Sequence, residues 1–359
     1  MLPSPENESL RQDYSESGDK GMNKIINSPD AMIREMLEGY LYANPQLLEK
    51  VPNTNGLVLR ERKNKVAIVT GGGAGNEPWN IGYVGNGLAD GVALGNVYAA
   101  PPAKAIMNVT KAVNHQKGVL FLATNHAGDV LNFELAGELL QLEGIRTQSV
   151  FVSDDITSAP FEKFDERRGV AGVAIVLKIA GAAADAGLAL DELIRVTQKA
   201  NRNIRTLSVT TSPGYLPSTG EAMFDMEPGM IEFGMGFNGE PGILKTKLMP
   251  ADKIVDVMMD YLLGDLKPAA TDEIAVFING FGFTGLLELC IVNRRIKMVL
   301  DQKSLKIHDM FIDTLLAPQG TGGFSISLLQ LDDELKGYYN YPADSPFFRK
   351  KALQGLVID

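Results

Sequence analysis

The residues best placed to do chemistry lie in two glycine-rich loops of similar form. The stretches VTGGGAGNEP (69–78) and GMGFNGEPG (234–242) each combine glycines with an asparagine, Asn76 or Asn238, which is followed within two positions by Glu and then by Pro. Glycine lets the backbone approach a small ligand and present N–H groups to it, and an amide side chain both donates and accepts hydrogen bonds. The two loops predict two walls of one small polar pocket.

Neither loop matches a nucleotide-binding motif in its proper context. Gly234, Gly236 and Gly239 complete G-x-G-x-x-G, but a dinucleotide fingerprint ends a strand and opens a helix, whereas Gly239 is followed by Glu-Pro-Gly. The stretch 69–78 breaks the same pattern at Asn76, and the sequence contains no G-x-x-x-x-G-K-[ST]. We therefore interpret the match at 234–239 as accidental.

A third loop, TNHAGDVLNFE (124–134), joins a predicted strand to a predicted helix. Asp129 there could cap the helix or act as a general base toward a hydroxyl group, and the sequence leaves both roles open. His126 is the one histidine near such a loop. With three histidines, one cysteine and no spaced cluster, the sequence predicts no metal site.

The elements around these loops predict an α/β fold. Short β-branched runs at 65–70, 118–124 and 147–153 alternate with helical patterns at 130–144 and 167–187, which is typical of a mostly parallel, doubly wound sheet. The loops 69–78 and 124–134 then lie at the carboxyl edge of that sheet, where open α/β sheets bind ligands. A first helix is expected to begin at Ser28 and Pro29.

The rhythm changes near residue 203, where half-buried strands at 204–212 and 229–237 precede an α+β arrangement. We therefore divide the chain into four parts. These are a polar, disordered extension (1–21), an α/β domain with the glycine-rich loops (22–202), a smaller α+β domain (203–335) and a C-terminal segment that packs back on the first domain (336–359).

Composition excludes several classes of protein. A net charge of −10 argues against direct nucleic-acid binding, and no apolar run reaches the roughly 18 residues of a membrane helix. The single cysteine, Cys290, excludes an intramolecular disulfide and indicates a cytoplasmic protein. Its apolar neighbours in LLELCIV predict that it fills the core rather than acting as a nucleophile.

Five motifs now carry a resemblance: GGGAGNEP, GDVLNFE, RRGVAGVAIVLKIAGAAA, EFGMGFNGEPG and GFSISLL. Their order and spacing resemble the substrate-binding K subunit of dihydroxyacetone kinase, from Met22 to the end of the sequence. The resemblance implies an α/β domain followed by a smaller α+β domain, a homodimer, and a role in glycerol metabolism with the phosphotransferase system. It also implies that this chain binds no cofactor, and that ATP or ADP with Mg is held by a partner L subunit.

The sequence departs from the family at the pocket. The family has histidines at the positions of Asn76 and Asn238, and the second of these forms a covalent hemiaminal with the substrate carbonyl. An amide nitrogen is conjugated and not nucleophilic, so Asn238 cannot form that adduct. Ala100 stands where the family has a hydroxyl, and Thr124 where it has Lys. Asp129 matches the family's general base.

Two functional hypotheses follow from the resemblance. In the first, the chain binds a small ketose or polyol non-covalently for phosphorylation by an L subunit. Asp129 is then the catalytic base, and the expected substrate-binding residues are Gly72, Gly73, Asn76, Asn238, Thr124 and Asn125. In the second, the chain is a non-enzymatic coactivator that senses a ligand and engages a TetR-type regulator. Loss of both histidines fits relaxed catalytic demand, whereas the retained Asp129 favours the first hypothesis.

Overall fold

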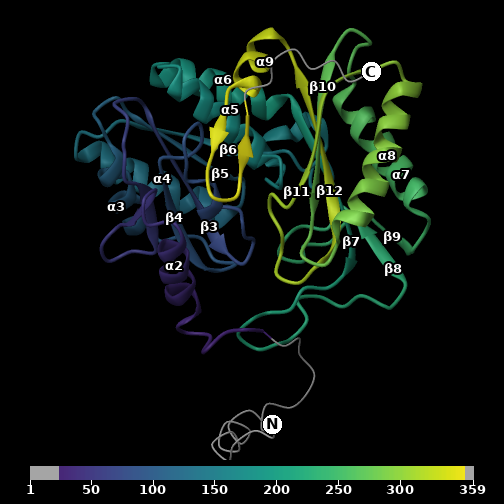
Figure 1. The fold of residues 1–359 in the computed structure, drawn as a ribbon, viewed down its shortest axis with the longest axis horizontal. Coiled ribbons are helices and arrows are strands. Elements are labelled where there is room, and N and C mark those ends of the chain that lie inside the picture. The colour runs from purple at the N-terminus through teal and green to yellow at the C-terminus, as the bar shows by residue number, and fades with distance from the viewer. Residues whose placement is uncertain (1–23, 352–359) are drawn as a thin grey trace, which may run out of the picture.

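The computed structural model describes residues 24–351, so the predicted extension 1–21 and the last residues of the segment 336–359 lie outside the described part. The described chain forms two six-stranded sheets with helices packed on them (Figure 1). The helices are α2 (Met32–Ala43), α3 (Ala103–Val113), α4 (Ala127–Leu142), α5 (Val173–Asp185), α6 (Leu190–Arg202), α7 (Ala251–Leu266), α8 (Leu286–Gln302) and α9 (Asp333–Asn340), with the short 3₁₀ turns η2 (Ile81–Tyr83) and η3 (Phe161–Glu166).

The first sheet is the predicted mostly parallel sheet. In spatial order its strands are β1 (Leu48–Lys50), β2 (Gly56–Leu59), β4 (Gly91–Val97), β3 (Ala67–Ala74), β5 (Val119–Thr124) and β6 (Thr147–Val152). Strands β4, β3, β5 and β6 run parallel, and β1 and β2 extend the sheet as an antiparallel edge. The carboxyl ends of the parallel strands therefore meet at one edge, as the alternation of strands and helices predicts.

The second sheet is mixed. Its strands, in spatial order, are β11 (Lys306–Asp313), β10 (Glu273–Gly280), β12 (Gly322–Leu331), β7 (Ile204–Ser212), β8 (Met230–Phe233) and β9 (Leu244–Lys247). Only β10 and β11 pair in parallel, and the other neighbours are antiparallel. The sequence pattern at 204–212 marks β7 correctly, but the strand predicted at 229–237 ends at Phe233, and its second half is a loop.

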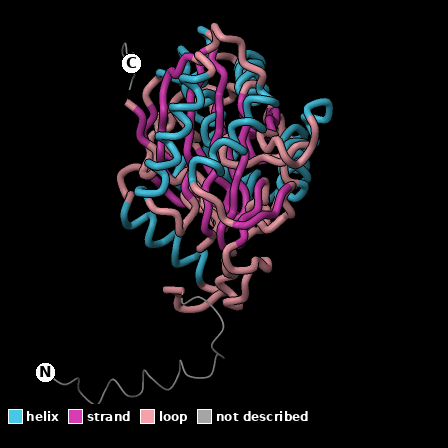
Figure 2. Tube along the Cα trace, turned by 90° about the vertical axis from the view of Figure 1, so that its right-hand side faces the viewer, coloured by secondary structure: helices cyan, strands magenta, loops and turns pink. Residues whose placement is uncertain are grey.

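Helices separate and cover the two sheets (Figure 1). Helices α3 and α4 pack on one face of the first sheet, and α5 and α6 cover its other face. The same buried cluster continues from α5 and α6 to the inner face of the second sheet. Helices α7 and α8 cover the outer face of that sheet, and they lie in front of its strands in Figure 2. None of the helices in residues 24–351 combines the length and apolar composition needed to cross a membrane.

Helix α5 contains many small residues, because it lies in the middle of this arrangement and is packed closely on all sides. Every residue from Val173 to Ala184 is buried. A Cβ on Gly181 would lie 2.3 Å from the carbonyl oxygen of Gly87, so any side chain there would push the helix away from the backbone beside it. The Gly and Ala content of 167–187 predicts this close packing.

Three local predictions need correction. Helix α2 begins at Met32, and Ser28 Oγ accepts from Ala31 N one turn before it. Strand β3 continues through the glycines to Ala74, because Gly71, Gly72 and Ala74 still pair with neighbouring β4. Cys290 is exposed and does not fill the core, because the inner side of α8 is formed by its other apolar residues.

The segment after β12 returns to the first sheet. The short hairpin of β13 (Ala343–Asp344) and β14 (Arg349–Lys350) follows α9, and Asp344 forms a bridge with Asn86. Ser345 Oγ donates to the Gly82 carbonyl oxygen at 2.6 Å. These contacts fix η2, which follows the first glycine-rich loop.

Candidate functional site

Loops from both sheets converge on a cavity of about 230 Å³. The first sheet contributes the ends of β3, β4 and β5, and the second sheet contributes the loop between β8 and β9. The residues that line the cavity are Gly72, Gly73, Asn76, Trp79, Asn80, Tyr98, Ala100, Thr124, His126, Gly128, Asp129, Phe237, Asn238 and Leu316. The cavity therefore contains both asparagines that the sequence places on opposing walls.

The wall formed by the first loop presents two amide groups. Asn80 is fully buried, and its Nδ2 donates to the Gly73 carbonyl oxygen at 3.2 Å, which leaves its Oδ1 as an acceptor. Asn76 is half-buried, and its Oδ1 is also buried. Neither Oδ1 has a hydrogen-bond partner among the described residues. This wall offers acceptor oxygens to a ligand.

Asp129 lies in the first turn of α4 and is 7% exposed. Its Oδ2 accepts a hydrogen bond from Thr124 Oγ1 at 3.4 Å, and its Oδ1 is buried with no partner in the described part of the chain. Burial raises the pKa of Asp129 to about 7, and the Thr124 hydroxyl offsets part of that rise. A carboxyl group with this pKa can accept a proton near neutral pH.

The opposing wall is held in shape by charged residues behind it. Asn238 donates from its backbone N to Glu240 Oε2 at 3.0 Å and from Nδ2 to Glu240 Oε1 at 3.4 Å. Arg168 donates to the Gly234 carbonyl oxygen at 3.1 Å and pairs with buried Asp155. A Cβ on Gly236 would lie 2.2 Å from the carboxylate end of Glu240, so a side chain there would displace that carboxylate. The glycines of 234–239 thus shape a turn between two strands, away from any helix start.

His126 also reaches the cavity. It is the residue before α4, and its Nε2 lies 3.9 Å from Glu240 Oε1, on the opposing wall. That Nε2 is buried and has no hydrogen-bond partner among the described residues. Burial is the main influence on the ring and lowers the pKa of His126, with the Arg168 charge acting in the same direction and Glu240 and Asp155 opposing it.

The chemistry of the cavity follows from these unpaired atoms. Four buried polar atoms on its lining residues have no partner within residues 24–351: Asn76 Oδ1, Asn80 Oδ1, Asp129 Oδ1 and His126 Nε2. A buried polar atom that stays unpaired costs about 1–3 kcal/mol. Because three of the four are carboxyl or amide oxygens, the cavity suits a small ligand that carries several hydroxyl groups.

The structure gathers most of the predicted substrate contacts here and sets one apart. Gly72, Gly73, Asn76, Thr124 and Asn238 line the cavity, together with Asp129. Asn125 does not. Its Nδ2 donates to Ser153 Oγ and to the carbonyl oxygens of Asp165 and Arg167, so its amide holds a neighbouring loop in place. In this structure the amide of Asn125 therefore has a structural role, and its expected substrate contact stays a prediction.

Sequence reasoning missed several lining residues. Asn80, Tyr98 and Leu316 belong to no motif that suggests a ligand. Tyr98 completes a wall by tertiary contact, because its hydroxyl accepts from Gln319 N at 3.1 Å across 221 positions. Burial raises the pKa of Tyr98 to about 12, so its hydroxyl stays protonated. Of these three residues, only Asn80 could have been suspected from the sequence, because it is a polar residue two positions after the first glycine-rich loop.

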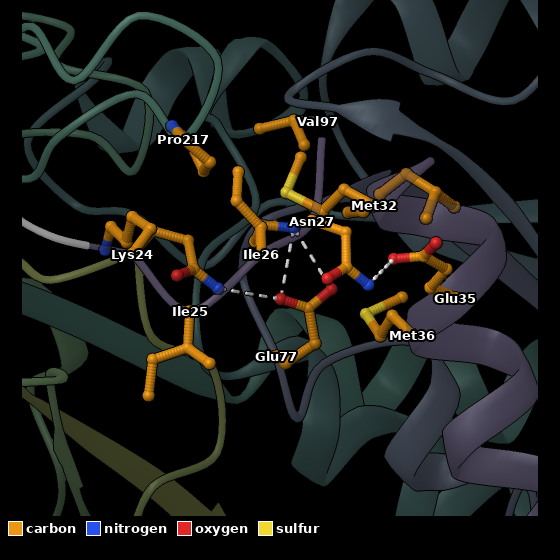
Figure 3. Close-up of a pocket in the computed structure, with 14 residues that line it drawn as sticks. Lys24, Ile25, Ile26, Asn27, Met32, Glu35, Met36, Glu77, Val97 and Pro217 are labelled. Atoms are coloured by element: carbon orange, nitrogen blue, oxygen red, sulfur yellow. Dashed lines mark hydrogen bonds between the residues drawn. The ribbon is translucent and has the colours of Figure 1, made fainter. Parts of the chain in front are cut away.

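A larger cavity of about 660 Å³ lies on the other side of the first loop (Figure 3). The segment 24–36 forms much of it, with methionine and isoleucine side chains. Both of its acidic residues are already engaged: the Glu77 carboxylate accepts from Gly75 N at 3.1 Å and from Gln319 Nε2 at 3.3 Å, and Glu35 accepts from Asn27 Nδ2 at 2.9 Å. None of its lining residues has an unpaired buried polar side-chain atom among those described. The smaller cavity is therefore the better site for a polar ligand.

The fold and the smaller cavity together define a class of protein: a two-sheet α/β protein that binds a small hydroxylated ligand where its sheets meet. The Dak1 domain pattern matches residues 38–347, and this chain belongs to that family. It is 39% identical over 331 residues to the dihydroxyacetone-binding subunit DhaK of PTS-dependent dihydroxyacetone kinase 2 from Listeria innocua serovar 6a, covering 91% of this chain and 99% of the relative. The resemblance to the K subunit is confirmed.

Other relatives are longer or differ in role. The chain is 37% identical over 336 residues to the L-erythrulose kinase of Pectobacterium atrosepticum, covering 92% of this chain but only 57% of that protein. The dihydroxyacetone kinase of C. freundii superposes with a TM-score of 0.85 at 29% identity, over 95% of this chain and 62% of that chain. The dihydroxyacetone kinase operon co-activator Dha-DhaQ superposes with a TM-score of 0.81 at 29% identity, over 87% of this chain and 97% of the other. The predicted fold class is confirmed.

Proposed function

We propose that this chain is the substrate-binding subunit of a dihydroxyacetone kinase-type phosphotransferase. It binds a small ketose or polyol non-covalently in the smaller cavity and presents one hydroxyl for phosphorylation. The observation that carries the proposal is Asp129, a buried carboxyl group with an unpaired oxygen and a pKa near 7 in a cavity lined by polar acceptors. Dihydroxyacetone and erythrulose, named for the relatives, are ligands of suitable chemistry.

Asp129 acts as the general base in this proposal. Its carboxylate accepts the proton of the substrate hydroxyl while the hydroxyl oxygen forms a bond to the phosphorus of the donor. The bond from that phosphorus to the leaving diphosphate breaks, and the proton passes from Asp129 to solvent. The hydrogen bond from Thr124 Oγ1 keeps the carboxyl group directed at the cavity.

The phosphoryl donor belongs to a partner in this proposal. No lysine or arginine is among the described residues that line the cavity. The cavity lining therefore supplies no positive charge to neutralise the phosphates of a nucleoside triphosphate. A nucleotide-binding L subunit holding ATP or ADP with Mg would provide that charge when it covers the cavity. We propose a homodimer in the cytoplasm for the K-type subunit, in line with the family resemblance.

Non-covalent binding follows from the two asparagines. Asn76 and Asn238 line the cavity and can hydrogen-bond a polyhydroxylated ligand. Neither amide can add to a ketone carbonyl. Affinity then depends on hydrogen bonds, and the site can accept a four-carbon ketose as well as a triose.

A second candidate function is a ligand-sensing coactivator that acts with a TetR-type regulator. The similarity to the co-activator Dha-DhaQ over 97% of that chain favours it. In that case the cavity binds its ligand without turnover, and the same loops transmit the occupied state to a partner.

The deciding experiment is a phosphoryl-transfer assay with the full chain. Purified protein is mixed with an L-type subunit, its phosphoryl donor, and dihydroxyacetone or L-erythrulose, and the phosphate ester is followed by ³¹P NMR. Product that depends on this chain supports the phosphotransferase. If calorimetry shows ketose binding but no L-type subunit gives product, the phosphotransferase proposal is overturned and the sensor is favoured.

A further inference from the structure

His126 is the one cavity residue whose unpaired atom is a ring nitrogen rather than an oxygen. Its backbone belongs to the loop of Asp129, and its Nε2 lies 3.9 Å from Glu240 Oε1 on the loop of Asn238. The ring therefore lies between the two loops that close the cavity. The mechanism proposed above gives it no role.

A structural role does not account for the ring. His126 occupies the N-cap position of α4, but its side chain makes no capping hydrogen bond. Its contact with Glu240 is longer than a hydrogen bond. Nε2 is buried and unpaired among the described residues, although the ring edge as a whole is partly exposed. A ligand in the cavity is the available partner for this nitrogen.

Charge near the ring decides which nitrogen carries the hydrogen. Burial lowers the pKa of His126, so the imidazole is neutral at neutral pH and has one N–H. The Glu240 carboxylate faces Nε2 and attracts the positive end of an N–H bond. This charge favours the tautomer with the hydrogen on Nε2, and in that tautomer the atom is a donor.

We propose that His126 is a specificity-determining residue whose Nε2–H donates a hydrogen bond to the carbonyl oxygen of a bound ketose. The inference rests on the proposed function, because it takes the ligand to be a small ketose. The other unpaired atoms, Asn76 Oδ1, Asn80 Oδ1 and Asp129 Oδ1, accept hydrogens from hydroxyl groups, whereas a carbonyl oxygen has none to give and needs a donor.

This arrangement distinguishes a ketose from the polyol formed by its reduction. In the polyol, the carbonyl becomes a hydroxyl with a hydrogen of its own, and that extra donor needs a further acceptor at the same place. A site built around a particular donor and acceptor pattern discriminates against a ligand that leaves a polar group unpaired. The hydrogen bond from His126 thus makes the site prefer a ketose over the polyol, and this preference needs no covalent bond to the carbonyl.

The test is calorimetry on the full chain with two matched pairs, dihydroxyacetone against glycerol and L-erythrulose against erythritol. His126→Phe keeps a ring of similar size without the donor, and His126→Gln replaces the ring with an amide donor. We expect His126→Phe to weaken ketose binding about tenfold and to change polyol binding less than about threefold. His126→Gln should recover most of the ketose affinity, and His115→Phe, outside the cavity, should bind like the unmodified protein.

Each outcome separates this inference from the proposed function. If His126→Phe binds ketoses as the unmodified protein does, or loses ketose and polyol affinity equally, the role of His126 is overturned and the proposed function stands. If the unmodified protein binds polyols but no ketose, the role of His126 alone is overturned, and if it binds neither, both are overturned. A fall in the ketose-to-polyol ratio in His126→Phe, with recovery in His126→Gln, supports the inference.

Discussion

Asp129 receives one hydrogen bond from a side chain, that of Thr124 Oγ1 to Oδ2 at 3.4 Å, and its other oxygen is buried and unpaired among the described residues. No backbone N–H of the described chain donates to this carboxyl group, although Asp129 lies in the first turn of α4. The sequence leaves open whether Asp129 caps the helix or acts as a base, and the missing capping hydrogen bond favours the base. The predictions below on transfer, pH dependence and stability depend on Asp129.

Asp129→Asn should abolish partner-dependent phosphoryl transfer, with a loss of about 10²-fold or more, because the amide cannot accept the hydroxyl proton. Ketose binding should survive, because the amide can still hydrogen-bond both Thr124 and the ligand. Calorimetry and the ³¹P assay measure the two effects separately. Asp191→Asn, on the exposed side of α6, is the matched control. Transfer at the normal rate in Asp129→Asn would remove Asp129 from the mechanism.

The rate of transfer should depend on pH through Asp129. The group must be deprotonated to act as a base, and its pKa is about 7. We expect kcat/KM to fall about tenfold for each pH unit below about pH 7 and to level off above it. Thr124→Val removes the hydroxyl that lowers the pKa of Asp129, so the falling limb should move to higher pH. An unchanged limb in Thr124→Val would show that another group controls the profile.

The same burial should make Asp129 a cost to stability. Its pKa is about 7 in the folded protein against 3.8 as the ordinary value, so the folded state binds the proton more tightly than the unfolded state does. The penalty is absent below about pH 4, grows up to about pH 7 and is constant above, reaching at most roughly 4 kcal/mol.

Asp129→Asn should therefore raise the free energy of unfolding at pH 8 more than at pH 5. Urea denaturation at the two pH values measures the difference, with Asp191→Asn as the control. An equal effect at both pH values would mean that the carboxyl group is better solvated than its burial indicates.

Incubation with dihydroxyacetone should add no mass to the unmodified protein under native mass spectrometry. On the loop 234–242, Asn238 stands where the family has its nucleophilic histidine. Its amide is not nucleophilic and already donates to Glu240. Asn238→His should allow weak capture, and the double change with Asn76→His should bind distinctly better. A single-triose mass shift on the unmodified protein, mapped to residues 234–242, would contradict this account of the pocket.

The sequence predicts what depends on local pattern. The alternation at 204–212 gives β7 to the residue, and the glycine-rich loops, Asp129 and the α/β order are all visible along the chain. The error at Cys290 has a local cause as well. The apolar run around Cys290 predicts a core position, but α8 also has apolar residues such as Leu287 on its exposed side.

The site itself depends on contacts between distant segments, which pattern alone does not reveal. The similar form of the two glycine-rich loops predicts that the loop of Phe237 meets the first sheet, but no pattern indicates that this meeting brings His126 within reach of Glu240. Asn125 illustrates the converse. It lies beside the site in sequence, but its amide is used by the 165–167 loop. Side-chain direction within a loop is set by tertiary hydrogen bonds.

The bond from Ser345 Oγ to the Gly82 carbonyl spans 263 positions of the chain. During translation, a ribosome must add all of those residues after Gly82 before η2 can be fixed against the C-terminal hairpin. The first glycine-rich loop leads directly into η2, so the wall that carries Asn76 and Asn80 is completed only after the second sheet has been synthesised. A nascent chain arrested shortly after β6 could form most of the first sheet, but it would not yet bind the ligand.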